Sequence, residues 1–244
     1  MTLRDWCAAL LVTVFMMYAG NLVGTLVIRL VQTALGIPAS NPLETYIDGA
    51  SIALRVLFMV ILAPLLEELV FRRVLIDRMR PYGEKLAVVT SAVIFGLFHG
   101  NLSQMFYAFT IGLVLGTVYL LTGRLRYTVA LHMTVNFLGS VVAPWIVGRV
   151  GGDAGPDLAQ LDELTSLSQL FTPGTAALAV YLVLMLGAAV AGLIVLCANA
   201  HRVRFAPAPQ ELPKGKRFTT AYCNVGMILL LLACLGMVAL SAAA

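Results

Sequence analysis

Residues 52–79 read IALRVLFMVILAPLLEELVFRRVLIDRM, an apolar run that carries Glu67, Glu68 and Arg72 in its second half. A spanning helix needs about 20 predominantly apolar residues, so the run is long enough to cross a bilayer with some turns left over. Ionisable groups are costly in hydrocarbon, and such a group at membrane depth is a functional-site hypothesis by default. Pro64 shortly before Glu67 is expected to kink the helix near these charges.

The composition of the whole chain agrees with a membrane protein. Of its 244 residues, 60% are hydrophobic and only 11% are charged, whereas a soluble domain carries roughly 25% charged residues. This chain has too little polar surface to cover itself in water. It also lacks a basic, aromatic-interleaved stretch of the kind that binds nucleic acid. We therefore expect an integral, multi-pass membrane protein whose surroundings are the lipid bilayer, and no nucleic-acid partner.

The apolar runs predict the architecture. We expect an all-α fold, a polytopic transmembrane helical bundle of about seven helices, with no internal repeat and no soluble domain, so that residues 1–244 form a single membrane domain. The first run is too long for the apolar region of a signal peptide, and no small-residue cleavage site closes it. The expected helices are 6–31, 52–79, 86–100, 104–122, 127–147, 175–200 and 220–240.

The distribution of arginine and lysine predicts the orientation. One side of the expected bundle has most of them, near residue 4 and in the segments 72–85, 124–126 and 202–217. The other side has Arg29, Arg55 and Arg149 together with most of the loop acids. Because cytoplasmic loops carry an excess of basic residues, we expect the N-terminus in the cytoplasm and the C-terminus outside. The acidic loop between residues 150 and 174 would then face outward.

Two further motifs follow in neighbouring apolar segments, Phe95-x-x-x-His99 and His132-x-x-x-Asn136. The sequence around Tyr82 is a turn signal, and Glu67 and His99 stand at similar distances along the chain on either side of it. If the two flanking helices form an antiparallel hairpin, both residues lie roughly 22–26 Å from the turn and can meet.

The two adjacent glutamates point in directions about 100° apart on a helix, so we expect them to have different functions. Glu68 precedes Arg72 by four residues, the favoured order for a helical ion pair. We assign Glu68 and Arg72 a structural role as a pair that neutralises two charges in hydrocarbon. Glu67 has no such partner in its own helix and is the better general base. The alternative is that Glu67 joins an ion-pair network with Arg72 or Arg73.

The histidines and the asparagine complete the expected site. His99 beside Glu67 can hold and deprotonate a water molecule, although a lone histidine in a membrane helix can also just bond a backbone carbonyl. His132 and Asn136 share one helix face, and both can present N–H donors to a developing oxyanion. The alternative is that these two side chains only join helices by hydrogen bonds.

Taken together, Glu67-Glu68-x-x-x-Arg72, Phe95-x-x-x-His99 and His132-x-x-x-Asn136 resemble the motif series of the CAAX protease and bacteriocin-processing family (the CPBP or Abi family) of intramembrane proteases, which includes the type II CAAX prenyl endopeptidases. The resemblance covers about Leu62 to Phe137, and we expect a family core of about 52–147 with the motifs at 67–136. The flanking transmembrane helices 6–31, 175–200 and 220–240 lie outside the resemblance. It implies an intramembrane endopeptidase in which Glu67 and His99 activate water while His132 and Asn136 stabilise the oxyanion. The implied substrate is a membrane-associated or lipidated protein or peptide.

The cofactor expectation follows from the same residues. The family is often labelled metalloprotease, and histidine and glutamate are zinc ligands. However, the chain has no HExxH motif, in which both histidines fall on one helix face. We favour a reaction without a cofactor. The alternative is a zinc-dependent version of the same protease, with Glu67, His99 and His132 around the metal.

Two functions of other classes compete with the protease. One is a non-catalytic membrane scaffold, such as a bacteriocin self-immunity protein, that keeps the fold for partner binding. The other is a proton-coupled transporter, because buried glutamate and histidine also form proton relays. The chain lacks the paired halves and matched broken helices that are typical of transporters.

Overall fold

A computed structural model describes residues 1–35, 50–150, 172–206 and 208–243 of the chain. Within these ranges the protein is helical and has no strand, and it forms eight helices when segments that continue one another are counted as one. The bounds are α1 Leu3–Leu35, α3 Ile52–Leu54, η1 Arg55–Leu62, α4 Ala63–Glu68, η2 Leu69–Ile76, α5 Asp77–Met79, η3 Arg80–Tyr82, α6 Glu84–Phe98, α7 Leu102–Thr122, α8 Leu125–Phe137, η4 Leu138–Val142, α9 Ala143–Val147, α11 Pro173–Asn199, η7 Ala200–Arg202, η8 Lys214–Lys216, α12 Arg217–Tyr222 and α13 Val225–Ala243.

The expected fold class is confirmed. Four helices are long and apolar enough to cross a membrane, and they run over Leu3–Ala34, Leu102–Thr122, Leu125–Val147 and Pro173–Arg202. The segment from α3 to η3 is one continuous helical rod, which begins where the apolar run begins. These apolar helices support an integral membrane protein.

Wide, π-type turns interrupt the rod on both sides of α4, over η1 and η2. Such turns are rare and occur frequently at functional sites. In η1 the amide of Ala63 bonds to the carbonyl of Phe58, five residues back. In that register the donor for the carbonyl of Met59 would be residue 64, which is a proline and has no N–H. Pro64 therefore leaves the Met59 carbonyl free for a partner outside the rod.

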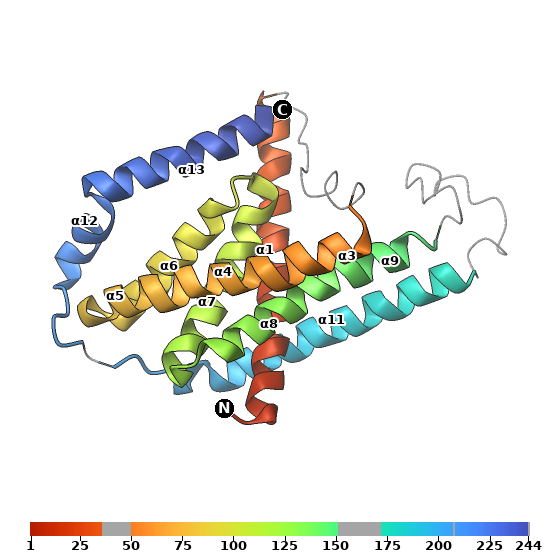
Figure 1. The fold of residues 1–244 in the computed structure, drawn as a ribbon, viewed down its shortest axis with the longest axis horizontal. Helices are drawn as coiled ribbons and strands as arrows, with labels where there is room; N and C mark the ends of the chain where they lie inside the picture. The colour runs from red at the N-terminus through yellow and green to blue at the C-terminus, as the bar shows by residue number, and fades with distance from the viewer. Residues whose placement is uncertain (36–49, 151–171, 207, 244) are drawn as a thin grey trace.

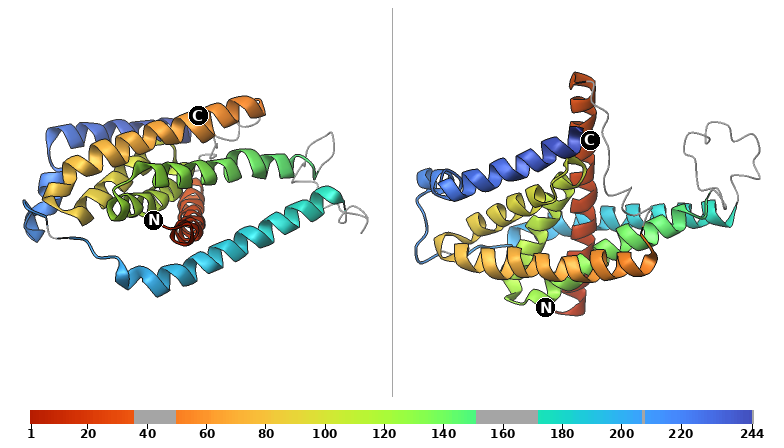
Figure 2. Two further views of the ribbon diagram at one scale, coloured as in Figure 1. Left: turned by 60° about the horizontal axis from the view of Figure 1, so that its bottom comes forward. Right: turned by 45° about the horizontal axis from the view of Figure 1, so that its top comes forward.

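The helices from α4 to α8 surround the core. Figure 1 shows α4, α6, α7 and α8 side by side, with α1 running across α4, α8 and α11. The turned views in Figure 2 show the same crossing, with α1 almost end-on in the left panel. The largest fully buried side chains include Arg72, Phe95 and Leu115 together with Glu68. A charged pair thus lies at the centre of an otherwise apolar core.

Two helices pack against α1 by backbone contact. A Cβ atom added to Gly20 would lie 2.4 Å from Oγ1 of Thr110 and 2.6 Å from Cα of Tyr107, so α1 touches α7 at this point. Thr110 also donates a hydrogen bond to the carbonyl of Met16 at 2.7 Å. A Cβ on Gly192 of α11 would lie 2.0 Å from the carbonyl oxygen of Leu11. These contacts require glycine, and they hold α1 between α7 and α11.

The expected helix 220–240 differs from the structure. The chain forms α12 up to Tyr222 and a separate helix α13 from Val225. The side chain of Asn224 accepts a hydrogen bond from the amide of Met227 at 2.9 Å, which is an N-cap interaction that begins a new helix. Met237 of α13 then packs against Gly100 at the end of α6. The acidic loop expected to face outward lies mostly outside the described residues.

Candidate active site

Glu68 and Arg72 form the buried centre of the site. Both side chains are fully buried, and Arg72 donates from Nε to Oε2 of Glu68 at 3.0 Å and from Nη2 to Oε1 at 3.1 Å. The third guanidinium nitrogen donates to Oγ of Ser91 at 3.0 Å, and Ser91 donates to the carbonyl of Phe71 at 2.8 Å. The guanidinium carbon also lies 4.8 Å from the centroid of the Phe95 ring. The two charges are thus paired, hydrogen-bonded and enclosed, as burial of an ion pair requires.

His132 of α8 lies between the two glutamates. Its Nδ1 is 3.1 Å from Oε1 of Glu68, and its Nε2 is 3.6 Å from Oε2 of Glu67. Glu68 is paired with the Arg72 guanidinium, and a carboxylate in such a pair only accepts hydrogen bonds, so we assign the Nδ1 proton to the bond with Glu68. The other ring nitrogen, Nε2, faces the Glu67 carboxylate and can donate to an acceptor when it also carries a proton. Glu68 therefore orients His132, a contact that the spacing of residues in the sequence did not reveal.

The two adjacent glutamates point in different directions, as neighbouring positions on a helix do. The side chain of Glu68 has no exposed surface, whereas 21% of the Glu67 side chain is exposed. Glu67 lines a cavity, and Glu68 lies behind it. Arg73, which was the alternative partner of Glu67, instead lies 3.4 Å from Asp77.

His99 ends α6 and begins a tight turn into α7. Gly100 follows with a φ of 66°, a left-handed conformation that L side chains rarely adopt. Asn101 then caps α7 by accepting a hydrogen bond from the amide of Gln104, and it donates to the carbonyl of His99. Nδ1 of His99 lies 2.8 Å from the carbonyl oxygen of Phe95. A carbonyl only accepts, so Nδ1 is the protonated nitrogen and Nε2 has a lone pair for a water molecule or a substrate proton.

Asn136 is tied to the rod of the glutamates. Its Nδ2 donates to the carbonyl of Met59 at 2.8 Å, the carbonyl that Pro64 leaves free. One N–H of the amide is used in this bond, and the second N–H remains for another acceptor. The proline near the site thus gives Asn136 a fixed acceptor, and the amide is held in one orientation beside His132.

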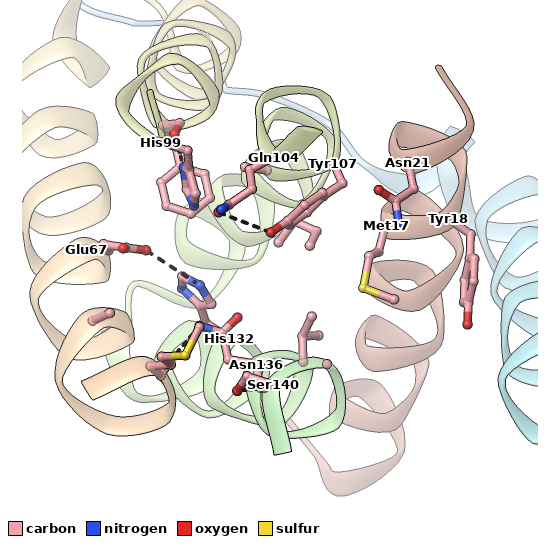
Figure 3. A pocket seen from close by; sticks show the side chains of 17 residues that line it. Met17, Tyr18, Asn21, Glu67, His99, Gln104, Tyr107, His132, Asn136 and Ser140 are labelled. Atoms are coloured by element: carbon pink, nitrogen blue, oxygen red, sulfur yellow. Dashed lines mark hydrogen bonds and ion pairs between the residues drawn. The ribbon is translucent and has the colours of Figure 1, made fainter. Parts of the chain in front are cut away.

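A cavity of about 370 Å³ joins these side chains. Glu67, His99, His132 and Asn136 all line it. Figure 3 shows Glu67, His99 and His132 on one side and Met17 and Asn21 of α1 on the other. Residues that sequence reasoning missed also line the cavity, namely Met17, Tyr18, Asn21, Gln104, Tyr107 and Ser140. The sequence signal that marks Asn21 and Gln104 is an amide side chain in an apolar, membrane-length segment.

A protein zinc site needs at least three ligand side chains close together. In the part of the chain that the structure describes, no three His, Cys, Asp or Glu side chains are grouped so that they could hold one. Glu67 and His132 approach each other, and His99 offers only Nε2 because Nδ1 bonds to Phe95. The side chains that the structure describes therefore do not form a metal-binding group in this arrangement.

Comparison with known proteins identifies the segment that contains the site. Residues 49–138 match the model of the Type II CAAX prenyl endopeptidase Rce1-like family. The match includes every motif position from Glu67 to Asn136, so the family resemblance drawn from the motifs is confirmed. Helices α1, α11, α12 and α13 lie outside it. No curated protein and no solved structure matches the chain.

Proposed function

We propose that this chain, whose residues 49–138 form an Rce1-like type II CAAX prenyl endopeptidase domain, hydrolyses a peptide bond in a membrane-associated or lipidated protein or peptide. The family match supports an intramembrane endopeptidase in general; the residue roles and the metal-free reaction are our proposal. One observation gives the main support for these residue roles. Glu67 faces Nε2 of His132 across 3.6 Å at a cavity wall, while Glu68 holds the other nitrogen of the same ring.

The first step uses Glu67 and His99. A water molecule between them loses one proton to the Glu67 carboxylate, while its remaining O–H donates a hydrogen bond to Nε2 of His99, which orients it. The water oxygen attacks the carbonyl carbon of the scissile bond. A new C–O bond forms, and the carbonyl electron pair moves to the oxygen to give a tetrahedral oxyanion.

The second step uses His132 and Asn136. The free N–H of Asn136 donates to the oxyanion, and His132 donates from Nε2 when both of its nitrogens carry a proton. The oxyanion then collapses, the C–N bond breaks, and the proton held by Glu67 passes to the leaving amine. The products are a carboxylic acid and an amine, which together contain the atoms of the peptide and one water molecule.

The substrate class follows from the surroundings of the cavity. Its walls belong to helices of which α1, α7 and the continuous stretch from α8 to α9 are long and apolar enough to cross a membrane. A peptide that reaches such a cavity must itself be stable in or at the bilayer. A lipidated terminus, a leader peptide or a transmembrane segment meets this condition.

The test replaces Glu67 by Gln, which preserves the volume and removes the base. Wild-type protein in liposomes and the Glu67→Gln variant are incubated with membrane-anchored reporter peptides, with and without a chelator, and the bound metal is measured on the same samples. We expect cleavage that survives the chelator and a loss of at least about 100-fold in the variant, since general-base catalysis contributes 10²–10⁴-fold. Glu211→Gln, at an exposed carboxylate that does not line the cavity, is the matched control.

Other outcomes would change the assignment. Cleavage by Glu67→Gln at the wild-type rate would remove Glu67 as the base. Cleavage that stops with the chelator and returns with one zinc per chain would support the zinc-dependent alternative. If no reporter is cleaved and Glu67→Gln rescues a cellular phenotype of the deletion, the scaffold function is favoured instead.

A further inference from the structure

A peptide bond inside a membrane is protected by its own helix. Every backbone N–H and C=O group in hydrocarbon needs a hydrogen-bond partner, and an unpaired one costs several kcal/mol. A water molecule can attack the carbonyl only after the substrate has unwound locally. A protease that works at this depth must therefore offer new partners to the unwound substrate backbone, as a neighbouring strand does in a sheet.

Asn21 and Gln104 are suited to this function by chemistry. A carboxamide side chain donates from nitrogen and accepts at oxygen, so it can pair with the N–H and the C=O of a peptide at the same time. Both residues line the cavity that contains Glu67 and His132. Asn21 lies on α1 and Gln104 in the first turn of α7, on the sides of the cavity away from Glu67 (Figure 3).

Both amides have hydrogen-bonding groups that are available to a substrate. Asn21 is exposed at the cavity, and its side chain has no hydrogen-bond partner within the described residues. It lies in an apolar helix that is long enough to span a membrane. Gln104 accepts a bond from the hydroxyl of Tyr107 at 3.3 Å through Oε1, which orients the amide and leaves its nitrogen as a donor. A polar group at such a position is costly unless it binds something.

The wall that carries Asn21 is held rigidly. Gly20 is its neighbour in the chain, and the backbone of α1 at Gly20 touches the backbone of Tyr107. The hydrogen bond from Thr110 to the carbonyl of Met16 holds the same crossing point. The position of Asn21 relative to Gln104 is thus determined by direct contact between α1 and α7.

From this geometry we propose that Asn21 and Gln104 bind the backbone of the substrate in an extended conformation and hold its scissile carbonyl next to Glu67 and His132. The inference rests on the proposed function and adds to it the substrate conformation and the binding residues. It also assigns substrate binding to α1, which lies outside the segment that matches the family. Because the contacts are with the backbone, they apply to substrates of different sequence.

The first test measures steady-state kinetics of Asn21→Leu with the reporter peptide cleaved by the wild type. Leucine keeps a similar volume and loses both hydrogen bonds. A neutral hydrogen bond contributes about 0.5–1.5 kcal/mol, so we expect KM to rise about 3- to 10-fold while kcat stays within about 2-fold. The same pattern is expected for Gln104→Leu. Leu22→Ala, at an exposed position of α1 outside the cavity, should leave KM unchanged.

The second test distinguishes backbone binding from a structural effect. Reporter peptides are made in which one backbone amide at a time near the scissile bond is replaced by an ester, which removes a single N–H. One of these esters should raise KM for the wild type and have no further effect on Asn21→Leu. If the ester and the Asn21→Leu substitution raise KM independently at every position, so that their effects add, the inference is overturned.

The outcomes separate the inference from the proposed function. If the wild type cleaves the reporter and KM of Asn21→Leu is unchanged, the inference fails and the protease function stands. Binding of the uncleaved reporter is also measured in proteins that carry Glu67→Gln. If the wild type cleaves nothing but Asn21→Leu weakens this binding 3- to 10-fold, the proposed function fails and the binding site remains.

Discussion

Glu68 shows that one buried carboxylate can have two partners. It accepts both hydrogen bonds from Arg72 and the bond from Nδ1 of His132, and it has no exposed surface. The i, i+4 spacing predicted the contact with Arg72 because that contact is local. The bond to His132 joins α4 to α8 and has no counterpart in local spacing. The structural pair is thus also the group that orients a proposed active-site histidine.

We predict that Glu68→Ala destabilises the protein by about 3–5 kcal/mol, because it leaves the Arg72 guanidinium buried without its counter-charge. Cleavage should fall as well, because His132 loses the acceptor at Nδ1. Thermal unfolding and yield in detergent, followed by the cleavage assay, measure the two effects. Glu211→Ala breaks the more exposed pair with Arg217 and is expected to cost only about 0–1 kcal/mol. A Glu68→Ala variant as stable as wild type would contradict the structural role.

At the scale of single helices, Pro64 does more than bend the rod, because it also leaves a backbone carbonyl free to accept a hydrogen bond from Asn136. Pro64 was expected to kink the helix near the glutamates. In the structure the rod changes to wide turns, and the carbonyl of Met59 becomes the acceptor for Asn136. The proline therefore affects the site through a missing N–H rather than through shape alone.

The crossing of α1 over α7 gives a prediction at the same scale. Gly20→Val would place side-chain atoms inside the backbone of α7, so α1 has to move away. Overpacking of this kind costs about 1–3 kcal/mol, and the movement would displace Asn21 from the cavity. We expect a lower melting temperature and a higher KM, measured in detergent and in liposomes.

Gly187→Val is the matched control for that experiment. Gly187 also lies in a long apolar helix, α11, but a Cβ atom there would meet nothing within 4 Å. The intrinsic effect of replacing glycine in a helix is the same at both positions. Any difference between the two variants in melting temperature or KM is therefore due to the contact between α1 and α7. Equal behaviour of the two variants would mean that the contact at Gly20 has no role in the cavity wall.

At the scale of the whole molecule, the helix ends are arranged by charge. Figure 1 shows α5 and α12 at one end of the molecule and α3 and α9 at the opposite end. The basic segments around residues 78–85 and 202–217 belong to the first end. The orientation remains a prediction: the positive-inside rule places this end in the cytoplasm.

Single cysteines test the orientation. In a chain whose native cysteines are replaced by alanine, we introduce Gln210→Cys at the basic end and Gly148→Cys after α9, both at exposed positions. A membrane-impermeant maleimide should label residue 148 in intact cells, and residue 210 only after permeabilisation. The reverse pattern would invert the predicted orientation without changing the site.

The sequence by itself determined the membrane character, the helical class, most helix positions and the motif residues. These features depend on composition and local spacing, and residues 49–138 match the family that the motifs indicated. Only the tertiary structure decided that His132 bonds to Glu68, that Asn136 bonds to Met59, and that α1 supplies a wall of the cavity. The reason is physical: these contacts join helices that are distant in the chain, and their geometry depends on how the backbones pack. The local spacing of residues describes one face of one helix, and it does not specify which side chains of another helix that face will contact.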